Sequence, residues 1–201
     1  MTTVSGQVTP YGRCLLIGLG GLFFGATGPL ISTFVPPLVR GTLGDHRTAI
    51  GTVMAIDNVL LLLLVPWAGA ASDRARARGR GRLRLVLLGY VLATIGLVIF
   101  PSSARFGLYG IVAAIVLLQG GINLQRSPFQ ALIADVVASR YRSLANGSVT
   151  FQMCVGAVVF LMLGRIVGMH AAFRLAAVTV LVIGLAFYLA LREKTTSIEP
   201  P

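Results

Sequence analysis

An isolated acid, Asp57, is the residue of this chain whose surroundings most favour chemistry, because it lies inside a long apolar run with Asn58 beside it. In a helix it would lie roughly 13 Å from the nearer end of that run. An acid inside a bilayer costs about 2.5 to 3.5 kcal/mol on insertion scales, so it is usually kept for a purpose. Asp57 therefore predicts coupling to a proton or cation, or contact with a solute. The alternative is that it only bonds another helix.

Amide side chains occur in two further apolar runs, at Gln119 and Asn123 and then at Gln152. Polar groups in hydrocarbon need partners or water, so we expect these runs and the one described above to face an interior cavity. The runs 83–100 and 171–191 carry few polar residues and are expected to face lipid. A single amide is better explained by a hydrogen bond between helices, whereas the whole set favours a cavity. The residues predicted for cation coupling and solute contact are Asp57, Asn58, Gln119, Asn123 and Gln152.

Enzymatic chemistry finds little support in the sequence. His46 and His170 lie outside the apolar runs and only one acid lies within them, so acid–base pairs and metal sites cannot be assembled. Cys14 and Cys154 both lie in apolar segments and suggest neither a disulfide framework nor a metal cluster. The net charge of +11 comes from arginines in short loops and not from a surface suited to nucleic acid. We therefore expect no enzyme, no metal or other cofactor, and no nucleic-acid partner.

The composition indicates which elements carry these residues. Of the 201 residues, 56% are hydrophobic and only 11% are charged, and about 20 apolar residues suffice for a helix to cross a bilayer. We predict an all-α polytopic membrane protein with six transmembrane helices. The bundle takes residues 14–191, between a polar leader, 1–13, and a polar tail, 192–201. The six predicted spans are 14–39, 48–71, 83–100, 106–127, 144–164 and 171–191.

Basic residues are distributed unevenly between the loops, and this predicts the orientation of the helices in the membrane. The residues expected inside number eleven, namely Arg13, the six alternating arginines from Arg74 to Arg84, Arg140, Arg142, Arg192 and Lys194. The loops on the other side carry five, namely Arg40, Arg47, Arg105, Arg165 and Arg174. Arg126 is assigned to the inner end of the fourth span. Basic loops stay inside, so we expect both termini on the cytoplasmic side of the cell membrane.

Glycine and proline predict how the first helix packs. Gly21 and Gly25 are separated by three residues, a spacing that lets another helix approach closely. Pro29, Pro36 and Pro37 are expected to kink or end this helix.

Charges near the inner ends of the spans also predict contacts. Asp73 ends the second span, where the helix dipole is already negative, so it needs an arginine or a helix N-terminus from elsewhere. Gly69, one turn earlier, would let another helix approach. Residues 126–143 are interpreted as a second charged inner loop.

Several motifs together resemble a known family. Gly69-Ala-Ala-Ser-Asp73-Arg74, followed by arginines and glycines, is similar to the loop between the second and third spans of the major facilitator superfamily. R-x-P-F-x-A-L-I-A-D at 126–135 and R-x-L-A-N-G at 142–147 narrow the resemblance to sugar–cation symporters, the sucrose-transporter-like and glycoside–pentoside–hexuronide branches. The resemblance covers essentially the whole chain, although those branches usually have G-R-R where this chain has Arg80-Gly81-Arg82.

The resemblance implies a transporter whose two six-helix halves swing about a central site. It also implies a cytoplasmic gating motif in which Asp73 meets a helix of the second half. The residues that the resemblance assigns to this motif are Gly69, Asp73, Arg74, Arg78, Arg82, Asp135 and Arg142.

The end of the chain shortly after the sixth span leads us to expect one half of a major-facilitator fold. Such a half would pair with a second copy or with a separately encoded half. It would move a small polar solute, a sugar, together with a proton or sodium by alternating access. The alternative is a truncated or non-transporting membrane subunit of the same family.

Overall fold

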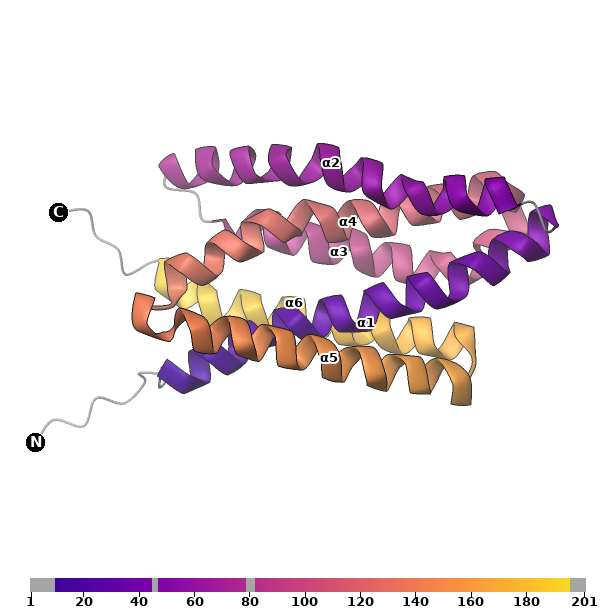
Figure 1. Ribbon diagram of the computed structural model, residues 1–201. Helices are drawn as coiled ribbons and strands as arrows, with labels where there is room; N and C mark the ends of the chain where they lie inside the picture. The colour runs from indigo at the N-terminus through magenta and orange to yellow at the C-terminus, as the bar shows by residue number, and fades with distance from the viewer. Residues whose placement is uncertain (1–9, 45–46, 79–81, 196–201) are drawn as a thin grey trace, which may run out of the picture.

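The computed structural model describes residues 10–44, 47–78 and 82–195. Within these ranges every element is helical, and no strand is found, so the predicted all-α class is confirmed. The elements are α1 (Pro10–Leu43), α2 (Arg47–Ala77), α3 (Leu83–Ile99), η1 (Phe100–Phe106), α4 (Gly107–Val136), η2 (Ser139–Tyr141), α5 (Arg142–Ile166) and α6 (Met169–Thr195). They form one bundle, with α2 and α5 at opposite edges (Figure 1). Predictions for 1–9, Asp45, His46, 79–81 and 196–201 lie outside the described residues.

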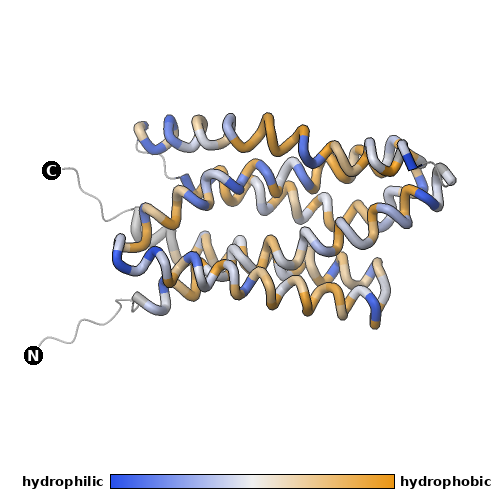
Figure 2. The backbone as a smooth tube through the Cα atoms, in the orientation of Figure 1, coloured by the Kyte–Doolittle hydropathy of each residue, from blue (hydrophilic) through white to orange (hydrophobic). Residues whose placement is uncertain are grey.

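Five helical stretches are long and apolar enough to cross a membrane, which supports the predicted multi-pass membrane protein. They are Tyr11–Thr42, Ile50–Ala77, Leu83–Val136, Ser139–Ile166 and Met169–Ala190. The third stretch has 54 residues because it contains α3, η1 and α4 in succession. Hydrophobic residues predominate along these helices (Figure 2), and many large ones are exposed, such as Leu63 and Val158.

Helices α1 and α5 pack with their backbones in contact. A Cβ atom at Gly21 would overlap the carbonyl group of Val149, and one at Gly25 would overlap that of Met153. The predicted role of these two glycines in helix packing is therefore confirmed. Of the two effects expected of the prolines, a kink or an end of the first helix, the end is excluded, because α1 continues through all three prolines to Leu43. Proline removes one backbone donor, but its fixed φ still fits a helix.

Helices α3 and α4 form a second close pair. Gly89 and Gly121 lie against each other, and a Cβ atom at Gly96 would be 2.6 Å from Cα of Leu118. These contacts run in opposite directions along the two helices, so the chain reverses between them. The reversal occurs at η1 and ends at Gly107, whose φ of 64° is a conformation that glycine adopts without strain.

Aromatic rings join α3 and α6 to the rest of the bundle. Tyr90 packs against Phe23 of α1 at a centroid distance of 4.7 Å and against Phe187 of α6 at 6.0 Å. The expectation that 83–100 and 171–191 face lipid is thus only half correct, since each helix has one exposed face and one face in the core. The edge helices α2 and α5 also expose apolar side chains, such as Leu62 at 72% and Phe151 at 69%.

The predicted loop at 126–143 is also corrected. Helix α4 continues from Gly107 to Val136, through Pro128, and only 137–141 connect it to α5. The predicted fourth span ended at 127 because the sequence becomes polar there. A polar turn of a helix and a loop both appear in the sequence as a run of polar residues, so the sequence alone did not distinguish the two structures.

Candidate functional site

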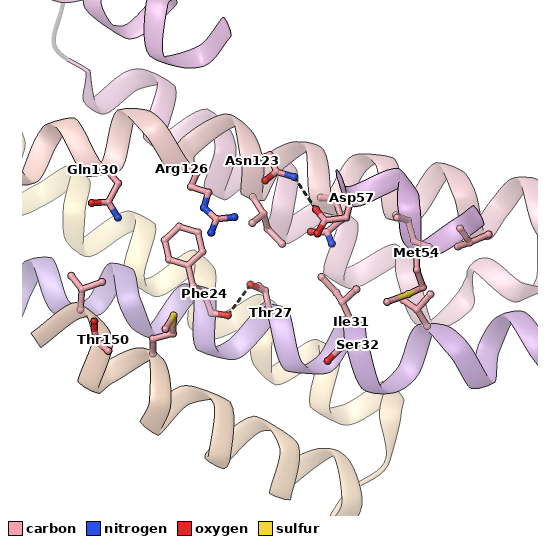
Figure 3. A pocket seen from close by; sticks show the side chains of 18 residues that line it. Phe24, Thr27, Ile31, Ser32, Met54, Asp57, Asn123, Arg126, Gln130 and Thr150 are labelled. Carbon is pink, nitrogen blue, oxygen red and sulfur yellow. Dashed lines mark hydrogen bonds between the residues drawn. The ribbon is translucent and has the colours of Figure 1, made fainter. Parts of the chain in front are cut away.

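A cavity of about 380 Å³ lies between α1, α2, α4 and α5, while α3 and α6 supply none of the residues that line it (Figure 3). A volume of this size suits a small ligand. Apolar side chains such as Ile31 and Val53 form part of the wall. The polar side chains that line the remainder include Thr27 on α1, Asp57 on α2, Gln119, Asn123 and Arg126 on α4, and Thr150 on α5.

Asp57 is half-buried in the cavity wall and bonds to α4 across the helix interface. Nδ2 of Asn123 donates a hydrogen bond of 3.0 Å to Oδ1 of Asp57 (Figure 3). Asn123 is 1% exposed, and its side-chain oxygen has no hydrogen-bond partner among the described residues. The carboxylate therefore bonds another helix and also faces a cavity, while its coupling to a cation stays a prediction.

Three of the five predicted cavity residues come together in the structure, namely Asp57, Gln119 and Asn123. The other two do not line the cavity. Asn58 is exposed, since a step of one residue turns a helix by about 100°. Gln152 lies at the contact of α1 with α5, where its Nε2 donates to the carbonyl oxygen of Leu15 at 3.2 Å.

Arg126 is the most important cavity residue that the prediction missed. It was assigned to the inner end of a span, but α4 continues for ten more residues and carries its guanidinium group along the cavity wall. Gln119, Asn123, Arg126 and Gln130 recur at intervals of four, three and four residues, which places them on one helix face. This spacing can be read from the sequence, and it predicts that Arg126 and Gln130 lie on the same helix face as Gln119 and Asn123.

A second group of charges connects α2, α3 and α4 at the end of the bundle where α2 ends. Arg82 contacts Asp73 at 2.9 Å and Asp135 at 3.0 Å, and Arg76 contacts Asp135 at 2.6 Å. We call these four residues the ion-pair network. The Arg82 side chain is only 11% exposed, so it lies between the two acids and not in open solvent.

The ion-pair network contains three residues of the predicted gating motif, and it adds Arg76. Gly69 allows the predicted close approach, because a Cβ atom there would be 2.7 Å from Oγ of Ser127 on α4. Arg142 instead donates to the carbonyl oxygen of Ala134 at 2.9 Å. Arg74 and Arg78 are exposed, and among the described residues neither makes an ion pair.

Long apolar helices around a partly polar cavity are typical of membrane transport proteins. The chain matches the family model of the Major Facilitator Superfamily over residues 15–201 and belongs to that family, whose members are membrane transporters. A comparison with curated proteins finds no match to this chain.

Proposed function

We propose that the chain is one six-helix half of a secondary active transporter that moves a small polar solute together with a cation by alternating access. The observation that carries this proposal is the cavity, because it places a carboxylate, Asp57, beside amide and hydroxyl groups within membrane-spanning helices. A carboxylate there suits a proton or sodium ion. The resemblance of the sequence motifs to sugar–cation symporters favours a sugar as the solute.

Six crossings are proposed from the reversal at η1. A continuous helix of 54 residues would be roughly 80 Å long, whereas the apolar core of a bilayer is about 30 Å thick. Since α3 and α4 pack side by side in opposite directions, the stretch Leu83–Val136 counts as two crossings. The start of α1 and the end of α6 then lie on the same side of the membrane, and the positive charge of the α2–α3 connection favours the cytoplasmic side (Figure 1).

A second six-helix unit is proposed because the described residues do not close the cavity. The exposed polar residues that line the cavity include Arg126, Gln130 and Thr150. Hydrocarbon cannot satisfy such groups, so something other than lipid must cover them. Halves of this superfamily are related by an axis along the membrane normal, which suits a second unit packed against α1, α2, α4 and α5.

The ion-pair network is proposed to act as part of the gate at the cytoplasmic side. It connects the ends of three helices near the polar end of α4, where a change in the separation of α2 and α4 would alter access to the cavity. Ion pairs of this kind can break and form again at moderate cost, so they can stabilise one conformation over another.

The experiment is uptake of labelled sugars into proteoliposomes under an imposed proton or sodium gradient. We expect Asp57→Asn to abolish accumulation above equilibrium while the protein still inserts and folds, because a neutral amide cannot hold the cation. Asn58→Ala, at an exposed position beside it, serves as the matched control and should retain accumulation. If the Asp57→Asn variant accumulates solute as the unmodified protein does, Asp57 does not couple a cation and serves only in helix packing. A stable protein without any uptake would favour a non-transporting subunit.

A further inference from the structure

Arg126 is a cationic group on the cavity wall for which the described residues provide no partner. The side chain is exposed, and its guanidinium makes no hydrogen bond or ion pair within the described part of the chain. It lies nine residues before Asp135, roughly 13 Å along α4 from the ion-pair network. Arg126 is therefore separated from the charges at the end of the bundle and lies beside the cavity (Figure 3).

Asp57 does not neutralise this charge. Among the eighteen residues that line the cavity, Asp57 and Arg126 are the charged ones, yet no contact within 4.0 Å joins them. Asp57 instead accepts its hydrogen bond from the neutral amide of Asn123. A cation within a span costs about 2.5 to 3.5 kcal/mol on insertion scales, so an unpaired arginine in this position needs a function.

The geometry of arginine limits what this function can be. Its guanidinium group carries five N–H donors in a rigid fork and no acceptor, a pattern that matches the two oxygens of a carboxylate. The same cavity is also lined by Phe24, Gln130 and Thr150, which supply an aromatic ring and further polar groups (Figure 3). A small solute that carries both a carboxylate and hydroxyl groups would use all of these contacts.

We propose that the transported solute carries a carboxylate group, which binds the guanidinium of Arg126 while the accompanying cation occupies Asp57. This inference rests on the proposed function and specifies the solute class. The charges balance, because a monoanion on Arg126 and a monovalent cation on Asp57 together leave the total charge of the cavity unchanged. With a neutral solute, the described residues would leave the guanidinium group without an anionic partner, and an acid of the second unit would have to supply one.

The test compares small acids with neutral molecules of similar shape. The unfolding temperature of the purified protein is measured in mild detergent with three pairs of compounds, each an acid and a neutral counterpart. The pairs are lactate and propane-1,2-diol, gluconate and sorbitol, and nicotinate and nicotinamide. We expect at least one acid to raise the unfolding temperature above the value found with its neutral counterpart, since a ligand that binds the folded state stabilises it. The shift should vanish in Arg126→Gln and be partly retained in Arg126→Lys, which keeps the charge but loses the fork.

Two results would overturn the inference. One is that no acid stabilises the protein more than its neutral counterpart, as expected if a carboxylate of a second unit occupies Arg126. The other is that the shift in unfolding temperature survives in Arg126→Gln.

Uptake in proteoliposomes separates this inference from the proposed function. Cation-driven uptake of a neutral sugar that is unaffected by Arg126→Gln would refute the proposal that the solute carries a carboxylate. The proposal that the protein is a transporter would stand. Binding of an acid that depends on Arg126, without any uptake, would refute the proposal that the protein is a transporter. The proposal that Arg126 binds a carboxylate would stand.

Discussion

Single glycines determine how closely the helices of this bundle approach one another. Without a hydrophobic force between helices inside a bilayer, association depends on close packing, and small residues permit it. Gly121 on α4 lies against the backbone of α3, since a Cβ atom there would be 2.7 Å from the carbonyl oxygen of Gly89. Its neighbour Gly120 has no atom within 4 Å of the corresponding position. The two adjacent glycines thus have different structural roles.

Gly121→Ala should destabilise the protein, whereas Gly120→Ala should not. Both substitutions gain helix propensity, up to about 1 kcal/mol, so the difference between them isolates the overlap with α3. The overlap involves backbone atoms that cannot rotate away, and we expect a cost of roughly 1 to 3 kcal/mol. Thermal unfolding in detergent measures both variants. Equal stability of the two would show that α3 and α4 are less closely packed than described.

The cavity residues show what sequence reasoning can find at the scale of single residues. Asp57 stood out because a carboxylate in an apolar run is costly, and this argument does not depend on the fold. Asn58 and Gln152 were misplaced because the type of a residue does not reveal the direction in which its helix face points. Arg126 was missed because it was assigned to the inner end of the fourth span, although its spacing from Asn123 matched one helix face.

Among the elements, α2, α3 and α4 are held together at one end by the ion-pair network. Asp135 contacts both Arg76 and Arg82 and its side chain is 23% exposed, whereas Asp73 contacts Arg82 alone and is 67% exposed. Solvent weakens exposed ion pairs, so the two acids should differ in importance although they share an arginine.

Asp135→Asn should loosen the ends of three helices more than Asp73→Asn does. We expect a loss of roughly 1 to 3 kcal/mol for Asp135→Asn, between the values for exposed and buried pairs, and below about 1 kcal/mol for Asp73→Asn. Hydrogen exchange at the ends of α2, α3 and α4 measures the loosening, and thermal unfolding measures the loss of stability. A larger effect of Asp73→Asn would mean that its partner lies elsewhere in the assembled protein.

The length of α4 shows where element prediction from sequence is limited. Apolar content revealed every long helix, because each of them needs an apolar surface. It did not reveal where a helix ends, since residues 126–136 are polar enough to resemble a loop while they remain helical. Gly69 did predict that another helix approaches α2 closely, and the structure shows that this helix is α4, which the sequence did not identify.

For the whole molecule, the orientation in the membrane remains a prediction from the charge of the loops. Two single-cysteine variants test it in a background without Cys14 and Cys154. One cysteine replaces His170, in the first turn of α6, and the other replaces Arg78, just after α2. Both positions are exposed, so neither is protected by packing. With an impermeant thiol reagent on intact cells, His170→Cys should label and Arg78→Cys should label only after permeabilisation. The reverse pattern would invert the proposed topology.

The contact of α1 with α5 also has a consequence for how the protein is made. Cys14 donates to the carbonyl oxygen of Tyr141, which lies 127 residues later in the chain. At about 5 to 20 residues per second, a ribosome needs roughly 6 to 25 seconds to extend the chain that far. During this time α1 lacks α5, so the face that carries Gly21 and Gly25 is not yet covered. Because α1 carries no charge between Arg13 and Arg40, lipid can cover this face at low cost until α5 has been made.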